Sequence, residues 1–152
     1  MSTRNTASFM HHSGFSLIEL MVAVVVVAIL ASIAIPTYTA QILKSHRTEA
    51  RSAILDLAGR EERVLSVSNS YSQVPTDVGY TGTSWGTGLA VGSGYYTVVI
   101  TVGNSPPSFT ITATAAGGQT ADSSCASFTV NQLGQQSSLN SGATDSTSTC
   151  WK

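Results

Sequence analysis

Hydrophobic residues dominate one early segment of the chain. Residues 15–35, FSLIELMVAVVVVAILASIAI, form an almost unbroken apolar run in which Glu19 is the single charged residue. Wound as a helix with a rise of about 1.5 Å per residue, a run of this length reaches roughly the 30 Å of a bilayer hydrocarbon core. The pattern therefore predicts a helix that can span a membrane.

The helical pattern continues beyond this run. Pro36 removes one backbone hydrogen bond and predicts a kink rather than an end, because membrane helices tolerate proline where neighbours compensate. Apolar positions then recur at intervals of three and four residues to about Ser66, which predicts an amphipathic helix. The stripe comprises Ala50, Ala53, Ile54, Leu57, Ala58, Val64 and Leu65.

Two residues of this second helical half depart from the pattern. Gly59 weakens the helix by about 1 kcal/mol relative to alanine. Glu61 falls within the apolar stripe by angle. We expect its carboxylate to reach the edge of the stripe, the alternative being a buried polar contact.

The pattern changes to that of strands further along. Residues 67–94 lack periodicity and are rich in Gly, Thr and Pro, which predicts a long loop with turns. Residues 95–102 and 108–115 are rich in β-branched and aromatic residues and flank the turn GNSPP, which predicts an antiparallel hairpin. A third strand is expected at 126–130, with a turn near Gly134 and an irregular tail.

These elements predict an α+β fold. The long N-terminal helix, with a hydrophobic half and an amphipathic half, packs on a small antiparallel sheet of at least three strands. The stripe of the helix and one face of the sheet are natural partners, because each has an apolar side to bury.

Composition adds that the surface carries little charge. The chain has 152 residues, enough for one domain beside the apolar segment, and its formal net charge is -1. Charged residues make up 10% of it, against roughly 25% in soluble globular proteins. After Arg63 the charged residues are Asp77, Asp122, Asp145 and Lys152. Such a surface is neutral and rich in hydroxyl groups, and nothing in it indicates a nucleic-acid partner.

The basic residues and the cysteines disagree about which side of a membrane the C-terminal part occupies. Arg4 alone precedes the apolar run, whereas Lys44, Arg47 and Arg51 follow it, and a positive-inside count would leave the C-terminal part in the cytoplasm. The two cysteines favour the exported side.

Cys125 and Cys150 are the only cysteines of the chain. An even number in an exported domain predicts one disulfide, which would contribute roughly 3 kcal/mol by closing the loop between them. Two buried free thiols are the alternative. Their spacing and the lack of nearby histidine exclude a CxxC redox motif or a zinc site.

The N-terminal segment is signal-like but unusual, because an ordinary signal peptide has its small residue after the apolar core and here Gly14 precedes it. The sequence GFSLIELMVAVVVVAILASIAIPTY closely resembles the N-terminus of type IV pilins. In that family a Gly ends the leader, Phe begins the mature chain, Glu follows four positions later and Pro stands about twenty residues in. Gly14, Phe15, Glu19 and Pro36 match those positions. The remainder resembles the PilE-like minor pilins in its overall pattern.

The resemblance implies three segments: a leader at 1–14, a hydrophobic transmembrane and filament-core helix at 15–43, and a periplasmic, later extracellular, globular domain at 44–152. A prepilin peptidase would cut between Gly14 and Phe15 and methylate the new amine of Phe15. In the family the matching glutamate, here Glu19, is thought to neutralise that amine on a neighbouring subunit.

One departure lies in the leader, where HHS stands before Gly14 instead of the usual Lys or Arg. His11 and His12 suggest a metal site, but in a discarded leader we expect a solvated pair.

The carboxylate of Glu19 also has an explanation from elementary physics. An isolated carboxylate in hydrocarbon costs several kcal/mol, so it is usually paired or functional. A cationic amine from a stacked neighbour would suit it. The alternative is an acid at headgroup level, favoured by the helix dipole near the helix start.

The leading functional prediction is a structural subunit, a minor pilin, of a type IV pilus, the kind of filament that serves twitching motility and cell adhesion. The subunit would be held in the inner membrane by a single span and then assembled into the extracellular pilus. Its partners would be other pilin subunits, the peptidase and the inner-membrane assembly platform. We expect no cofactor and no metal.

Three other functions fit less well. A DNA-uptake receptor pilin would need clustered Lys and Arg, which the C-terminal domain lacks, although Trp85, Tyr95 and Tyr96 could offer stacking surfaces. A type II secretion pseudopilin is disfavoured by the cysteines and by the absence of a carboxylate-rich calcium loop. An enzyme fits least, since no histidine follows His46 and no two carboxylates form an acid/base arrangement.

Overall fold

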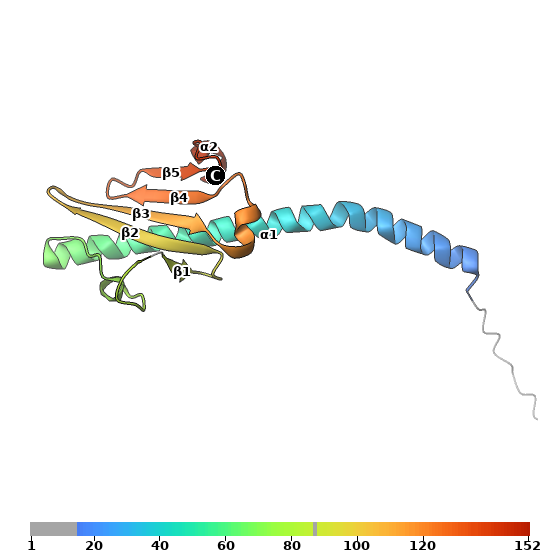
Figure 1. Cartoon of the computed structure of the whole chain (residues 1–152), viewed down its shortest axis with the longest axis horizontal. Coiled ribbons are helices and arrows are strands. Elements are labelled where there is room, and N and C mark those ends of the chain that lie inside the picture. Colours follow the sequence, from blue (N-terminus) through green and yellow to red (C-terminus); the bar gives the residue numbers. More distant parts are fainter. Residues whose placement is uncertain (1–14, 87) are drawn as a thin grey trace, which may run out of the picture. The chain divides into compact units, whose positions relative to one another are not determined.

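The computed structural model describes residues 15–86 and 88–152. The chain divides into two compact units, one ending at Thr39 and the other running from Ala40 to Lys152. Helix α1 (Leu17–Ser68) begins in the first unit, and its second half belongs to the second unit together with a five-stranded antiparallel sheet (Figure 1). The predicted α+β fold class, with a long N-terminal helix, is confirmed.

Helix α1 continues through Pro36 without ending there. Proline has no N–H, so the carbonyl of Ser32 loses its usual main-chain donor at this point. The kink at Pro36 stays a prediction. The helix ends two residues beyond the predicted Ser66, where Asn69 takes a left-handed φ of 57° and donates its N–H to Leu65 O at 2.8 Å. Asparagine tolerates this conformation better than most residues.

The sheet is an antiparallel meander in which every strand pairs with its neighbours in the sequence. The strands are β1 (Leu89–Val91), β2 (Tyr96–Asn104), β3 (Pro107–Ala115), β4 (Ser127–Asn131) and β5 (Gln136–Leu139). The predicted hairpin is β2 and β3, paired at Ile100 and Ile111, and the predicted third strand is β4.

Five short elements were not predicted. Strand β1 and the turn of 3-10 helix η1 (Pro75–Val78) lie in the segment expected to be loop. A second 3-10 turn, η2 (Gly117–Ala121), follows β3. The prediction of an irregular tail is wrong for β5 and for α2 (Thr147–Cys150). Strand β5 is polar, with only Ser138 buried, so main-chain pairing with β4 rather than a hydrophobic pattern defines it.

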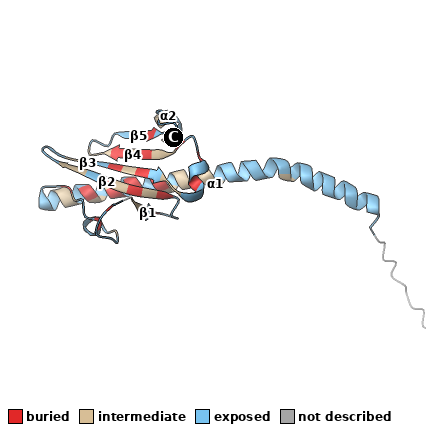
Figure 2. Ribbon diagram, viewed as in Figure 1, coloured by how far each residue is buried: buried red, intermediate tan, exposed pale blue. Residues whose placement is uncertain are grey.

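The core of the second unit lies between α1 and one face of the sheet (Figure 2). Buried residues alternate along the three long strands, as expected for a sheet with one covered face. From the predicted stripe of α1, Ala50, Ile54 and Leu57 are fully buried. The other members, Ala53, Ala58, Val64 and Leu65, are partly buried and pack against the same core. The stripe prediction is therefore confirmed.

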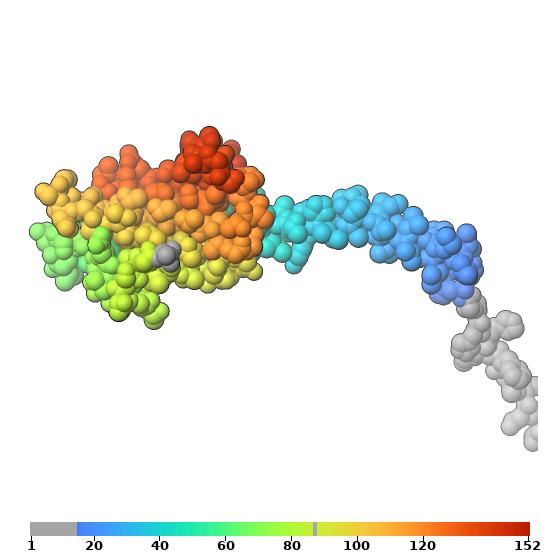
Figure 3. All heavy atoms as spheres, in the orientation of Figure 1, coloured from blue at the N-terminus to red at the C-terminus, as the bar shows by residue number. Residues whose placement is uncertain are grey.

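Figure 3 shows the outer surface of this unit, with the strands covering much of the second half of α1 in that view. Each fully buried aliphatic or aromatic side chain contributes about 1.5–3 kcal/mol relative to exposure. Ile54, Val98, Ile111 and Phe128 each have no exposed surface. Hydrophobic burial thus holds the sheet on the helix.

Candidate assembly site

The first unit exposes an apolar helical surface. From Leu17 onward its residues are mostly exposed, and one 18-residue window reaches a mean hydropathy of 2.9 with none of it buried. A helix of this length and composition can cross a membrane. Exposed apolar surface of this extent needs a lipid or protein cover.

Glu19 lies in the first turn of α1 and is exposed among apolar neighbours. Within residues 15–86 and 88–152 the side-chain ion pairs are Arg47 with Asp122 and Arg60 with Asp56, so Glu19 belongs to neither. Phe15, its neighbour in the predicted site, is 80% exposed. Gly14 lies outside the described residues, as do His11 and His12.

A polar network joins α1 to η2 at the start of the second unit. Gln119 is fully buried, and its two Nε2 hydrogens are shared among three acceptors, Leu43 O, Tyr96 Oη and Asp122 Oδ2, at 3.1–3.2 Å. Its Oε1 accepts from His46 Nδ1 at 2.9 Å. Every hydrogen-bonding atom of this buried amide is therefore satisfied.

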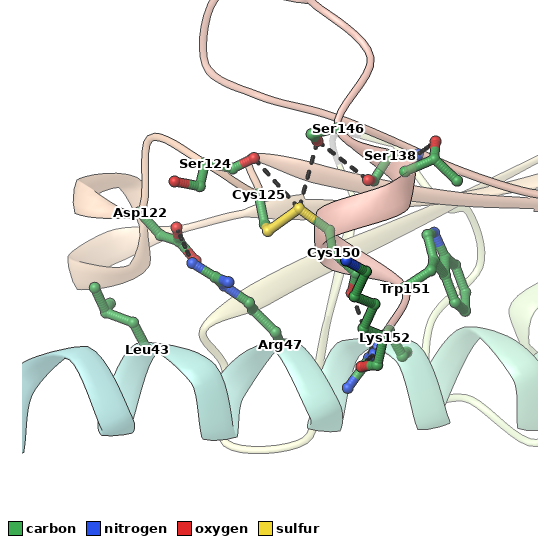
Figure 4. Close-up of a disulfide and its surroundings, with 12 residues drawn as sticks. Leu43, Arg47, Asp122, Ser124, Cys125, Ser138, Ser146, Cys150, Trp151 and Lys152 are labelled. Atoms are coloured by element: carbon green, nitrogen blue, oxygen red, sulfur yellow. Dashed lines mark hydrogen bonds and ion pairs between the residues drawn. A yellow bond between two sulfur atoms is a disulfide. The ribbon is translucent and has the colours of Figure 1, made fainter.

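Asp122 and Arg47 form the charged part of the network (Figure 4). The guanidinium donates from Nε and Nη2 to the two carboxylate oxygens at 2.6 and 2.7 Å. This two-pronged geometry is the strongest an arginine offers a carboxylate. The hydrogen bonds to Asp122 raise the pKa of Arg47, and burial raises the pKa of Tyr96 to about 12, so Tyr96 remains a hydroxyl donor to Cys125 O.

Cys125 and Cys150 form a disulfide, with their Cα atoms 5.9 Å apart. Closing a loop of 25 residues contributes about 3–4 kcal/mol on the chain-entropy estimate. Arg51 of α1 donates to the main-chain oxygens of Cys150 and Lys152, and Trp151 Nε1 donates to Ser137 O at 2.8 Å. The C-terminal tail is therefore tied both to the helix and to the sheet.

Glu61 is fully buried, which corrects the expectation that its carboxylate reaches the edge of the stripe. Its Oε2 accepts the N–H of Ser72 at 3.0 Å, and its Oε1 has no hydrogen-bond partner. The segment after α1 folds back over this face and covers it. Burial raises the pKa of Glu61, and the Ser72 hydrogen bond acts in the opposite direction.

Sequence reasoning missed the Gln119 network. Its partners lie about 75 residues apart in the chain, and nothing near them forms a recognisable motif. The sequence offers one hint of this network: Asp122 is among the few charged residues that follow Arg63. In the described part of the chain, no group of three His, Cys, Asp or Glu residues could hold a metal ion.

A long apolar helix continuing into an amphipathic half that packs on an antiparallel meander is the architecture of a type IV pilin-like protein. Comparison with known proteins identifies a family within the type IV pilin-like proteins. Residues 36–129 match the family described as "Type IV minor pilin ComP, DNA uptake sequence receptor", and residues 9–35 match the prokaryotic N-terminal methylation motif. The chain belongs to that minor pilin family. Pilins are structural proteins that assemble with other pilins into a filament.

A curated relative is the type IV major pilin protein PilA of Myxococcus xanthus (strain DK1622). It is 34% identical over 67 residues, which is 44% of this chain. The match spans 30% of the relative's own length.

The Arg47–Asp122 pair generates a first prediction. Asp122→Asn should lower the free energy of unfolding by about 1–3 kcal/mol, because it leaves a half-buried guanidinium without its counter-charge. Asp56→Asn, which breaks the exposed pair with Arg60, is the matched control and should cost under about 1 kcal/mol. Urea denaturation of the full chain in detergent measures both. Equal losses would show that the Arg47–Asp122 pair contributes no more stability than the exposed Arg60–Asp56 pair.

A second prediction concerns Glu61. Since the folded-state pKa is raised from its ordinary value of 4.5, ionisation of Glu61 costs more in the folded than in the unfolded chain, and its contribution to stability falls as pH rises above about 4.5. Glu61→Gln removes this charge while keeping an acceptor for Ser72. The variant should therefore gain stability relative to the wild type as the pH of a denaturation series increases from 4 toward 8.

Asp56→Asn is the control for this series, because Asp56 is exposed on the same helix and is not among the groups that shift the pKa of Glu61. It should show no comparable trend with pH. A Glu61→Gln variant whose stability runs parallel to the wild type at every pH would contradict the assignment.

Proposed function

We propose that this pilus subunit is made as a membrane-held precursor with a leader at 1–14, a span and filament-core helix at 15–43, and a globular domain at 44–152. A prepilin peptidase cuts between Gly14 and Phe15 and methylates Phe15. The domain is first periplasmic and then extracellular, and the subunit passes through an inner-membrane assembly platform. The methylation-motif match over residues 9–35, which spans the bond to be cut, supports this order.

The observation that carries the proposal is the exposed apolar surface of the first unit with one carboxylate in its first turn. That surface suits lipid before assembly and neighbouring helices afterwards. A shallow apolar hollow of about 530 Å³ lies on it, lined by Phe15, Leu20, Ala23, Val24, Val27 and Ala28. Small residues such as its two alanines let helices approach closely.

Glu19 guides each subunit into the filament. An unpaired carboxylate among packed apolar helices costs several kcal/mol, and the amine created at Phe15 by cleavage supplies a cation of the right charge. The cut before Phe15 thus makes the partner that Glu19 needs. Each subunit presents one surface to the next, so the contact repeats without closing.

Replacing Glu19 tests this mechanism. Glu19→Ala should leave cleavage largely intact, because the bond lies four residues away, and should reduce incorporation into pili by more than about tenfold through loss of the ion pair. Quantitative mass spectrometry of sheared pili and of membranes measures both. Glu19→Asp, which keeps the charge, should retain part of the incorporation. Normal incorporation of Glu19→Ala would assign the acid another purpose, and absence of the wild-type chain from pili would remove the filament proposal.

A DNA-uptake receptor is a second candidate, favoured because the matched family is described as a DNA uptake sequence receptor. The aromatic residues lend it little support, since Trp85 and Tyr96 are buried and Tyr95 stacks on His46 with ring centroids 3.6 Å apart. Of the six basic residues in the described chain, Arg47 and Arg60 are paired with carboxylates. Four cations remain to contact phosphates.

Titration of the full chain in detergent against duplex DNA tests this candidate. Each neutralised phosphate contributes about -0.9 to the slope of log K against log salt, so four free cations limit the slope to about -4. Saturable binding within that limit would support a receptor role. No saturable binding at low salt would exclude it.

A further inference from the structure

The segment 69–79, which we call the strap, folds back from the end of α1 along the last turns of that helix. Three of its side chains are buried, those of Tyr71, Pro75 and Val78, and its other residues are half-buried or exposed. Tyr71 packs edge-on against Phe109 of β3, with ring centroids 4.8 Å apart. A few apolar anchors therefore hold the strap on the core.

The rest of the contact between the strap and α1 is loosely packed. A shallow pocket of about 680 Å³ is lined jointly by strap residues and by the last turns of the helix, where Arg63, Val64 and Val67 contribute. The strap begins and ends at left-handed main-chain positions, Asn69 with φ of 57° and Gly79 with φ of 79°. Segments with few buried apolar contacts are those that open locally while the rest of a domain stays folded.

Three side chains near the end of α1 bind the strap by hydrogen bonds, and all three are ionisable. Glu61 Oε2 accepts the N–H of Ser72 at 3.0 Å, and Glu62 Oε1 accepts the hydroxyl of Tyr71 at 3.0 Å. Arg60 Nη1 donates to a main-chain oxygen of the strap at 3.0 Å. Burial raises the pKa of Tyr71, which therefore stays a hydroxyl donor.

Glu61 is the most enclosed of these groups. It has no exposed surface, and its Oε1 has no hydrogen-bond partner. Two carboxylates act on it, Glu62 from α1 and Asp77 from the strap. Of the neighbouring cations on the helix, Arg60 has its own carboxylate partner and Arg63 is exposed. The five strands carry no charged residue. A charge on Glu61 is therefore poorly compensated while the strap is closed.

We propose that the strap is pH-sensitive, closed on α1 while Glu61 is uncharged and opening locally once this carboxylate ionises. Opening brings water to the carboxylate, which relieves the cost of a buried charge. Burial raises the pKa of Glu61 above its ordinary value of 4.5 in the closed form, so protonation favours closing. That contribution is fully present below about pH 4.5 and is lost as the pH rises through the closed-form pKa.

Opening changes the surface of the second unit. The buried side chains of Tyr71, Pro75 and Val78 leave the core, and Phe109, which is 2% exposed in the closed form, loses its cover. The pH therefore controls whether an apolar patch at the end of α1 is covered. This property is independent of the filament role.

Hydrogen–deuterium exchange of the full chain in detergent, from about pH 5 to about pH 8, measures the opening when exchange times are scaled for intrinsic amide rates. In the wild type the protection of the strap amides should fall several-fold across the series. It should be lower than that of β3 at each pH and insensitive to sub-denaturing urea, because local opening exposes little surface. The protection of β3 should fall with urea.

Three variants assign the effect. Glu61→Gln removes the charge and keeps an acceptor for Ser72, so its strap protection should stay level with pH. Asp77→Asn removes one neighbouring negative charge and should give an intermediate decline. Glu49→Gln is the matched control and should decline as the wild type does. Glu49 also lies on α1 and accepts a main-chain N–H, from Ser93 at 3.1 Å, away from the strap.

Three results would overturn the proposal. The first is strap protection that does not fall with pH in the wild type. The second is a decline that persists in Glu61→Gln, which would assign it to another group. The third is protection of the strap and of β3 that coincides and responds alike to urea, since the strap would then open only when the whole unit unfolds.

Discussion

The structure depends on packing the apolar stripe of α1 against one face of the meander. Ile54 and Leu57 on the helix and Val98, Ile111 and Phe128 on the sheet are fully buried in one cluster. Neither surface is stable in water without the other, because a small sheet and a single helix each expose one apolar face. The other contacts of the second unit depend on this packing, because it brings their partners together.

Polar contacts then make the arrangement specific. Hydrophobic burial has little direction, whereas the Gln119 amide fits only when Leu43, His46 and Tyr96 lie at the right distances. The disulfide and the Arg51 contacts fix the tail in the same way. Glu61 is an exception, since it is buried with one oxygen unpaired and makes the fold more dependent on pH.

One continuous helix meets two environments, and its charges are distributed accordingly. The first unit has a single carboxylate, Glu19, on a surface suited to lipid or neighbouring helices. The second unit carries cations at Arg47 and Arg51, where they contact Asp122 and the C-terminal tail. Membership of the minor pilin family is consistent with this division, since we propose that the subunit leaves the membrane and enters a filament.

The sequence alone determined the features that depend on local pattern. The length and composition of the apolar run, the stripe of α1, the β2–β3 hairpin and β4 all follow from periodicities that one segment carries by itself. Strands β1 and β5 could not be predicted from local pattern. Strand β1 is three residues in a glycine-rich loop and β5 is the polar segment QSSL, and each becomes a strand only by pairing with its neighbour. The burial of Glu61 and the Gln119 network were decided by tertiary structure. The Gln119 network joins residues far apart in the chain, and only the folded core brings those residues together. The burial of Glu61 depends on the segment after α1 folding back, where Ser72 donates its N–H to the carboxylate.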